Sequence, residues 1–153
     1  MKQQDYHKTI TADIPADEAF AKIGCVSDWW TKGFSGQARK PGDTFSVRFG
    51  ETYVDFEITE VVPNKKIVWQ VTDCNLHRLK DKKAWNDTKV EWEVSSQSKT
   101  TKVNMTHVGL VPGIEGYEFF KEGWNFYVGE SLLKILNENK GLPDGRKSAH
   151  RIE

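Results

Sequence analysis

His107 is the residue whose type and setting most suggest chemistry. It lies in the segment TTKVNMTHVGL (100–110), where it alternates with Val103 and Met105 on one face of a predicted strand. Because imidazole titrates near neutral pH, an inward-facing His107 can anchor the polar end of a ligand or act as an acid–base group. The alternative is a buried histidine that is satisfied by a backbone carbonyl or by Tyr127.

Cysteine and histidine also occur at a spacing typical of metal sites, in the segment Cys74-x-x-His77. A zinc site needs three or four ligands. The remaining candidates all lie far away in the sequence: His7, Cys25, His107 and His150. No phosphate-binding loop, nucleophile elbow, HExxH motif or pair of carboxylates is present. We therefore predict neither a metal nor a cofactor, and we assign no catalytic residue.

Two adjacent tryptophans, Trp29 and Trp30, lie on a short predicted helix in the segment VSDWWTK. Neighbouring side chains on a helix point in different directions, so we expect only one of the two rings to enter the interior. The other would lie at a pocket entrance or in an interface. We place Trp30 among the predicted ligand-binding residues.

The segment DCNLHRLKDKKAWND (73–87) is long and charged, and it separates two predicted strands. One interpretation is a solvated hairpin loop. The other is a flap at the mouth of a pocket, with Leu76, Leu79 and Trp85 pointing inward. Its basic stretch is short and interrupted, which does not favour a nucleic-acid site.

Alternation of apolar and polar residues predicts six strands, each apolar on one side. They cover residues 6–14, 43–50, 52–62, 66–72, 88–94 and 100–110. One solvated face and one covered face are typical of an antiparallel sheet. After the first strand, Pro15 and an acidic first turn begin a short helix that ends at Gly24, and a second short helix follows.

One long helix, roughly residues 114–139, is available to cover the sheet. Its broad apolar stripe consists of Tyr117, Phe120, Trp124, Tyr127, Val128, Ser131, Leu132 and Ile135. A second, narrower stripe of Phe119, Phe126 and Leu133 lies on another side. The short N-terminal helices, a loop or a second copy of the chain would cover it, the last as an isologous dimer through this helix.

Composition narrows the class of protein. The 153 residues suit a single domain, which we place over residues 1–141, followed by a flexible tail over 142–153. Lys plus Arg and Asp plus Glu both number 22, so no positive excess favours a nucleic-acid partner. We see no secretory leader and no segment that approaches the roughly 20 apolar residues of a membrane span. We expect a cytoplasmic protein with two free thiols, Cys25 and Cys74, with a disulfide between them left open.

The order of these elements, together with several segments, resembles the SRPBCC superfamily of START-like, birch-pollen-allergen-like helix-grip proteins. The segments are FGETYVDFEITEVVPNKKIVWQ, WNDTKVEWEV, TTKVNMTHVGL and EGWNFYVGESLLKIL. Within the superfamily the chain is most similar to the activator of heat-shock-protein-90 ATPase homologue-like branch. The matching pieces are the hairpin ITEVVPNKKIVW, a Thr-His-x-Gly-Leu strand end at 106–110 and a Gly-Trp-x-x-Tyr helix at 123–127.

The resemblance, over about residues 6–139, implies an α+β fold in which a curved antiparallel sheet of about six to seven strands wraps around the C-terminal helix. It also implies a cavity between the two, and hence a binding protein for a small hydrophobic or amphipathic molecule. The residues expected to line this cavity are Trp30, Phe45, Phe56, Trp69, Trp92, Met105, His107, Trp124 and Tyr127. The alternatives are a cyclase- or hydrolase-like enzyme that uses His107 or Tyr127, and a chaperone-associated interaction protein.

Overall fold

Seven antiparallel strands form one sheet in the computed structural model, which describes residues 4–145. Their bounds are β1 (Tyr6–Ala12), β2 (Phe34–Gly36), β3 (Thr44–Phe49), β4 (Thr52–Val62), β5 (Lys66–Asn75), β6 (Lys89–Gln97) and β7 (Thr100–Val108). The spatial order β1-β7-β6-β5-β4-β3-β2 pairs the first strand with the last, and the other neighbours follow one another along the chain. Six of these strands match the predicted runs, whereas β2 was not predicted.

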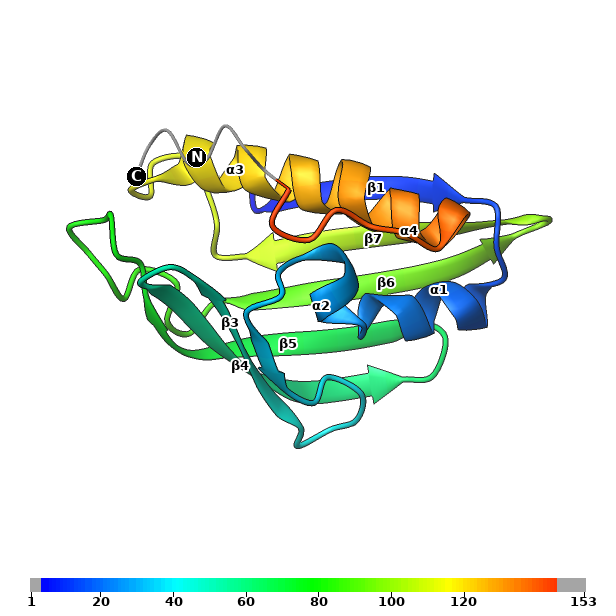
Figure 1. Cartoon of the computed structure of the whole chain (residues 1–153), viewed down its shortest axis with the longest axis horizontal. Helices are drawn as coiled ribbons and strands as arrows, with labels where there is room; N and C mark the ends of the chain where they lie inside the picture. Colours follow the sequence, from blue (N-terminus) through cyan, green and yellow to red (C-terminus); the bar gives the residue numbers. More distant parts are fainter. Residues whose placement is uncertain (1–3, 146–153) are drawn as a thin grey trace.

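Helices cover one face of the sheet (Figure 1). The bounds are α1 (Ala16–Ile23), α2 (Val26–Trp29), α3 (Tyr117–Phe126), the π-helix η1 (Tyr127–Leu132) and α4 (Leu133–Glu138). The last three follow one another without a break and lie along β1 and β7, while α1 and α2 lie beside them over the middle of the sheet. The predicted α+β helix-grip fold is therefore confirmed.

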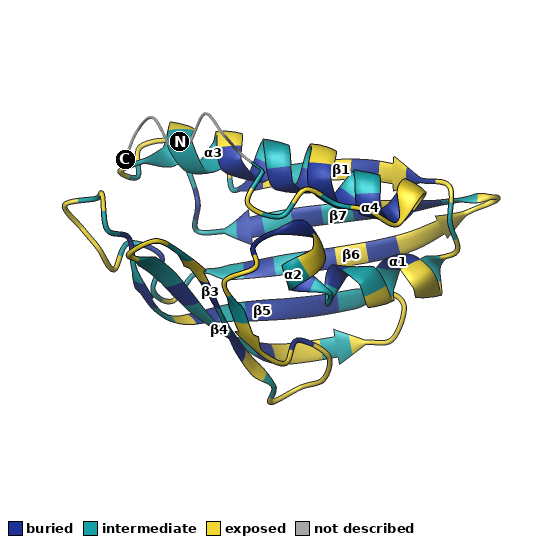
Figure 2. Cartoon of the chain, in the orientation of Figure 1, coloured by how far each residue is buried: buried dark blue, intermediate teal, exposed yellow. Residues whose placement is uncertain are grey.

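The core lies between the sheet and the helices, where Figure 2 shows the buried residues on the facing sides of both layers. On β4, Val54, Phe56 and Ile58 are buried, while the residues between them are more exposed. This alternation follows from the two-residue period of a strand, which places every second side chain on the same face. The pattern read from the sequence thus gives the correct inward face.

A bulge in β5 changes which residues face inward near its end. The register pairs Asp55 with Asp73 and Phe56 with Val71, so Thr72 is an extra residue without a partner on β4. An extra residue bends and twists the strand and reverses the alternation beyond it. As a result Cys74 is buried, and β5 continues to Asn75 instead of ending at residue 72 as predicted.

The C-terminal helix contains a π segment in its middle, and its buried residues repeat every four positions. They are Gly123 and Trp124, Tyr127 and Val128, Ser131 and Leu132, and Ile135 and Leu136. A period of four exceeds the 3.6 residues of an α-helical turn, so this stripe would drift around a plain α-helix. The wider turns of η1 keep it facing the sheet. The predicted broad stripe is confirmed, with Tyr117 and Phe120 at its half-buried start.

The chain after the helix returns across α2. The buried Ser131 hydroxyl donates to the Trp29 carbonyl (2.6 Å) and accepts from the Leu142 amide (2.7 Å). The Asp144 amide donates to the Trp30 carbonyl at 2.8 Å. Residues 142–145, the start of the predicted flexible tail, are therefore hydrogen-bonded to the rest of the fold, and 146–153 lie outside the described residues.

Candidate functional site

All nine predicted ligand-binding residues lie between the sheet and the helices, and none is more than 6% exposed. Five strand residues face inward: Phe45 on β3, Phe56 on β4, Trp69 on β5, Trp92 on β6 and Met105 on β7. His107 on β7, Trp30 after α2, Trp124 on α3 and Tyr127 on η1 complete the set. The ring centroid of Trp30 lies 4.8 Å from that of Trp124 and 6.2 Å from that of Trp69, so ring contacts connect the helices to the sheet.

Trp29 and Trp30 both enter this interior, so the expectation that only one would do so was wrong. They are 0% and 5% exposed, and their rings stack at 5.9 Å with an interplanar angle of 10°. The physical reason is that α2 ends at Trp29, and Trp30 has a distorted backbone (φ −103°, ψ −69°). The angular argument for a regular helix therefore does not apply to this pair, and both rings lie on Trp69 of the sheet.

All six tryptophans of the chain belong to one connected network of ring contacts. The contacts join Trp29 to Trp30 and Trp92, Trp69 to Trp92, Trp30 to Trp124 and Trp124 to Trp85. The centroid separations along these contacts range from 4.8 to 6.3 Å. Indole rings from both layers therefore occupy the interior where the resemblance implied a cavity.

His107 is buried and hydrogen-bonded through both ring nitrogens. The Trp124 indole N–H donates to Nδ1 (3.1 Å), so Nε2 of the neutral ring carries the proton and donates to the Thr88 hydroxyl (2.9 Å). Thr88 in turn donates to the Trp85 carbonyl at 2.7 Å. Burial lowers the pKa of His107 to about 3, which favours this neutral form. The partners are therefore Trp124 and Thr88, and no pattern in the sequence pointed to Thr88.

The β5–β6 loop, residues 76–88, closes one end of this interior. Leu76 and Trp85 are 2% and 4% exposed, and Leu79 is half-buried, so the solvated-loop interpretation is wrong for these three side chains. The Trp85 ring meets His107 at 4.5 Å and Phe120 of α3 at 4.8 Å. The inward orientation proposed for a flap is therefore observed, with the charged residues between these side chains exposed.

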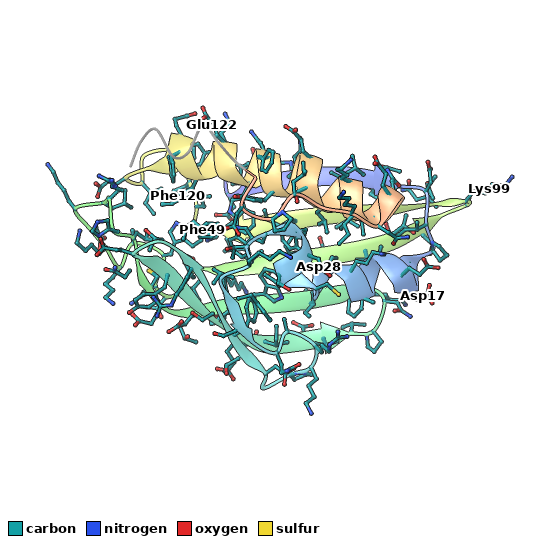
Figure 3. The ribbon with its side chains drawn as sticks, in the orientation of Figure 1. Asp17, Asp28, Phe49, Lys99, Phe120 and Glu122 are labelled. Carbon is teal, nitrogen blue, oxygen red and sulfur yellow. The ribbon has the colours of Figure 1, made fainter. Side chains whose placement is uncertain are left out.

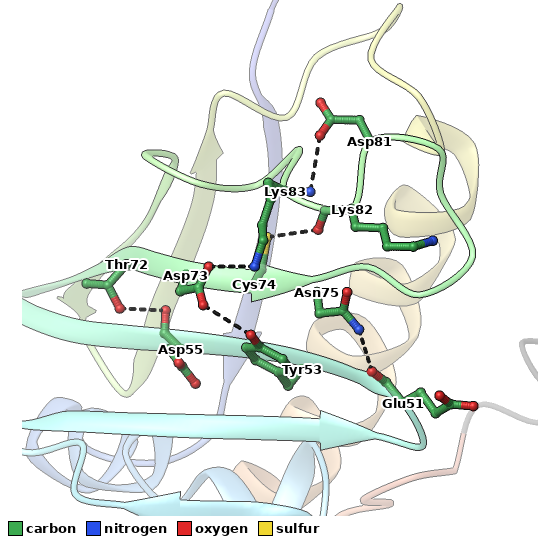
Figure 4. A network of polar contacts seen from close by, with 10 residues as sticks. All are labelled: Glu51, Tyr53, Asp55, Thr72, Asp73, Cys74, Asn75, Asp81, Lys82 and Lys83. Atoms are coloured by element: carbon green, nitrogen blue, oxygen red, sulfur yellow. Dashed lines mark hydrogen bonds and ion pairs between the residues drawn. The ribbon is translucent and has the colours of Figure 1, made fainter.

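One side of the β5–β6 loop is fastened to the sheet (Figure 4). Lys83 Nζ lies 2.9 Å from Asp73 Oδ1, and the Tyr53 hydroxyl donates to Asp73 Oδ2 at 3.1 Å. These hydrogen bonds from Lys83 and Tyr53 hold the pKa of the Asp73 carboxyl below its usual value. Beneath the loop, burial raises the pKa of the Cys74 thiol, which donates to the Lys82 carbonyl at 3.5 Å.

The other side of the β5–β6 loop is fastened to the segment before α3. The Glu115 carboxylate accepts from the backbone amides of Lys80 (2.8 Å) and Asp81 (3.1 Å), and these bonds lower the pKa of Glu115. Figure 3 shows Phe49 and Phe120 toward this end of the molecule, far from Asp17 and Lys99 at the other end. Both phenylalanines are half-buried, so this end is covered by a loop and by partly exposed rings.

Three indole N–H groups in this interior have no hydrogen-bond partner among the described residues: those of Trp69, Trp85 and Trp92. The indole N–H groups of Trp29 and Trp124 do have partners: that of Trp29 donates to the Ile23 carbonyl (3.1 Å), and that of Trp124 donates to His107. A buried donor without a partner costs about 1–3 kcal/mol. These donors therefore mark places where a hydrogen-bond acceptor from outside the chain would be stabilising.

The family profile described as Activator of Hsp90 ATPase homolog 1-like protein matches residues 18–137. The chain belongs to this family. The predicted SRPBCC superfamily and its branch are thereby confirmed. Comparison with curated protein sequences finds no match.

Solved structures with the same fold include relatives from several bacteria. The solution structure of the Aha1 dimer from Colwellia psychrerythraea has a TM-score of 0.74 and 22% identity, covering 90% of this chain and 98% of its own. DynU16, a putative protein in the dynemicin biosynthetic locus, has a TM-score of 0.69 and 18% identity over 92% of this chain and 49% of its own. Protein SSP2350 from Staphylococcus saprophyticus has a TM-score of 0.67 and 17% identity, covering 90% and 94%. Identities this low establish the fold alone.

This member of the Activator of Hsp90 ATPase homolog 1-like family also has a groove of mixed polar and apolar lining, of about 1320 Å³, at the end opposite the β5–β6 loop. It is open to solvent, and none of the nine predicted residues lines it. Within residues 4–145, no three His, Cys, Asp or Glu side chains are placed to share a metal ion, and Cys25 and Cys74 are free. No helix in the described range is long and apolar enough to cross a bilayer.

Proposed function

We propose that the protein binds a small hydrophobic or amphipathic molecule between the sheet and the C-terminal helix. The observation that carries the proposal is the single aromatic interior formed by the nine predicted residues, in which three indole donors lack a partner. Apolar walls with a few polar groups are the usual composition of small-molecule sites. The lining residues come from strands β3 to β7 and from the helix layer, as expected for a site between two layers.

The proposed entrance is the end covered by the β5–β6 loop. The nine residues are packed against one another, so a ligand enters only when some rings move apart. Half-buried Phe49 lies at this end, and its ring centroid is 6.0 Å from that of Trp30 and 6.1 Å from that of Tyr127. Loops have lower local stability than sheet interiors, which makes this loop the natural moving part.

Titration with Nile red, a neutral dye whose emission rises in apolar surroundings, tests the proposal. We expect micromolar binding together with quenching of tryptophan emission, because the site is lined by indole rings. Phe49→Ala should raise the association rate, since it removes a ring from the entrance while leaving the deeper walls intact.

Phe20→Ala is the matched control for this experiment. Phe20 is also half-buried, but it lies on α1, away from the proposed entrance. The association rate in this variant should stay at the wild-type value. The proposal fails if the dye leaves tryptophan emission unchanged in the wild type, since the aromatic interior would then be a core and nothing more.

The contacts of His107 give less support to an enzyme. An acid–base group must reach a substrate, whereas both ring nitrogens of His107 are engaged by Trp124 and Thr88 and its pKa is far below neutral. A cyclase- or hydrolase-like activity in the same interior, and a chaperone-associated role, stay predictions. The family description alone supports the chaperone-associated role.

A second proposal concerns assembly. The narrow stripe of Phe119, Phe126 and Leu133 stays half-exposed on the C-terminal helix, so the short N-terminal helices do not fully cover it. One relative with the same fold is described as a dimer. We propose an isologous homodimer in which this stripe packs against its copy.

A further inference from the structure

A short segment after the C-terminal helix lies across the turn that carries Trp29 and Trp30. We call this segment, residues 140–145, the strap. It leaves the end of α4 and runs back along the C-terminal helix, beside α2 (Figure 1). The buried Ser131 hydroxyl connects the three elements, because it donates to the Trp29 carbonyl (2.6 Å) and accepts from the Leu142 amide (2.7 Å). The strap is thereby tied to the segment that carries two rings of the aromatic interior.

The strap also bonds directly to the residues that follow α2. The Asp144 amide donates to the Trp30 carbonyl (2.8 Å), and the Asp144 carboxylate accepts from the Lys32 amide (2.9 Å). Two bonds in opposite directions fix the position of one segment against the other. At the other end of the strap, Gly141 has no room for a Cβ, because the Asp28 carbonyl oxygen occupies that place. The two backbones are therefore in direct contact along residues 28–32.

The strap is held by polar contacts rather than by buried apolar side chains. Its largest apolar side chain, that of Leu142, is 37% exposed. A hydrogen bond near the surface contributes little net stability, since water replaces the lost partner when the bond breaks. Segments with few buried apolar contacts open locally while the core stays folded. The strap can therefore detach without unfolding of the sheet or the C-terminal helix.

Trp30 is the ring whose backbone the strap fixes. Its ring centroid lies 4.8 Å from that of Trp124 on α3, 6.2 Å from that of Trp69 on the sheet and 6.0 Å from that of Phe49 at the proposed entrance. The Trp30 amide bonds locally, to the Val26 carbonyl at 2.8 Å, whereas its carbonyl bonds to the strap. Release of the strap therefore frees the backbone of a ring that touches both the entrance and the deeper walls.

We propose that the strap is a latch on the aromatic interior. While it is bonded to residues 28–32, Trp30 is fixed and the interior is closed. When it detaches, Trp30 moves and a ligand enters. This inference rests on the proposed function and adds to it an element that regulates access. The strap acts separately from the β5–β6 loop, which contacts the interior through Trp85 and His107.

Point variants of the full chain test the latch. Asp144→Ala removes the acceptor of the Lys32 amide and places alanine at a φ of +57°, a left-handed conformation that asparagine and aspartate adopt more readily. Asp144→Asn is its matched control, because it keeps an acceptor oxygen and tolerates this φ. Gly141→Ala opens the strap by a second route, since its Cβ would meet the Asp28 carbonyl. Leu142→Ala is the second control, because it keeps the bonded amide.

Hydrogen exchange measures both the opening of the strap and the access of water to the interior. In both opening variants we expect several-fold faster exchange at the amides of Leu142 and Lys32. The indole N–H of Trp69, which is 0% exposed, should also exchange several-fold faster, and Nile red should associate faster. Both controls should match the wild type. Unchanged exchange at the amide of Val103, on β7, confirms that each variant is folded.

The outcomes separate the latch from the proposed function. Faster exchange in the strap, with unchanged indole exchange and unchanged dye entry, would overturn the latch and leave the binding function standing. Unchanged exchange in the strap of both opening variants would also overturn it, because these contacts would then not hold the strap. If Nile red binds no variant while indole exchange still rises, the binding function fails and the strap still closes the interior.

Discussion

His107 illustrates how a residue that looks catalytic becomes structural once its neighbours are known. Its ring, on β7, joins Trp124 on α3 to Thr88, the last residue of the β5–β6 loop, and so connects the helix layer to the sheet and the loop. The imidazole is neutral because burial removes the water that would stabilise its charge. Protonation would place a second proton on Nδ1, where the Trp124 N–H already points.

Stability should therefore fall on mild acidification, and His107→Gln should reduce that fall. The pKa is near 6.5 in the unfolded chain and about 3 in the folded one, so the unfolded state takes up the proton first as pH falls below 6.5. Between pH 7 and pH 5 this coupling alone removes about 2 kcal/mol of unfolding free energy. A glutamine can accept from Trp124 and donate to Thr88 but does not titrate, so urea unfolding of this variant should show a smaller loss.

The control for this prediction is His77→Gln, which removes a half-exposed imidazole near Glu51. It should lose as much stability between pH 7 and pH 5 as the wild type does. An identical loss in His107→Gln would mean that His107 is not the source of the pH dependence.

At the scale of the element, two of the contacts that hold the β5–β6 loop are of different kinds. Lys83 with Asp73 fastens it to the sheet through an exposed ion pair, which contributes little to stability. Glu115 fastens it to the start of α3 by accepting two backbone amides, a charge-assisted arrangement with fixed geometry. We therefore expect Glu115 to govern opening of the loop.

Glu115→Ala should increase hydrogen exchange at the amides of Lys80 and Asp81 several-fold and speed the entry of Nile red. Acid should also speed opening of the loop. Because the pKa of Glu115 is lowered in the folded protein, the stabilisation that its carboxylate provides is fully present above the usual pKa of a glutamate. This stabilisation is lost as the pH falls through the lowered pKa. Glu118→Ala is the control, since its exposed carboxylate lies 3.9 Å from the Lys121 ammonium on the same helix. Unchanged exchange in Glu115→Ala would show that the apolar contacts of Leu79 and Trp85 hold the loop instead.

The elements also show what could be predicted from the sequence and why the rest could not. Long strands such as β4 were found within a residue or two, because alternation over eleven residues leaves one consistent interpretation. The three residues of β2 are too few to establish a period. The bulge at Thr72 has no local sequence signal, since it is set by pairing with β4. The four-residue period of the inward-facing residues in the C-terminal helix can be seen in the sequence, and in retrospect it indicates the π segment.

At the scale of the whole molecule, part of the candidate site could be predicted from the sequence and part could not. The nine predicted residues do lie together in the interior, because alternation and helical periodicity fix which side chains face inward. Contacts between segments far apart in the chain could not be predicted from the sequence. The roles of Trp85 and Thr88 depend on their contacts with His107 of β7, and the role of Glu115 depends on its contact with the β5–β6 loop. Whether the interior binds a ligand stays a prediction.

Assembly is the prediction that belongs to the molecule as a whole. Sedimentation velocity at tens of micromolar should show a dimer, and Leu133→Lys should convert it to a monomer by placing a charge in the apolar stripe. Val62→Lys, at an exposed valine on β4 outside the stripe, should leave the dimer intact. A monomer in the wild type at these concentrations would overturn the dimer.

The connected tryptophan network has an optical consequence. With all six rings joined by centroid separations of at most 6.3 Å, excitation absorbed by one indole can migrate to any other before a photon is emitted. The protein should therefore behave as a single chromophore: its emission should be strongly depolarised even though every ring is held rigidly. A single quencher that reaches any indole would quench the emission of all six, so tryptophan fluorescence should report on events in the interior.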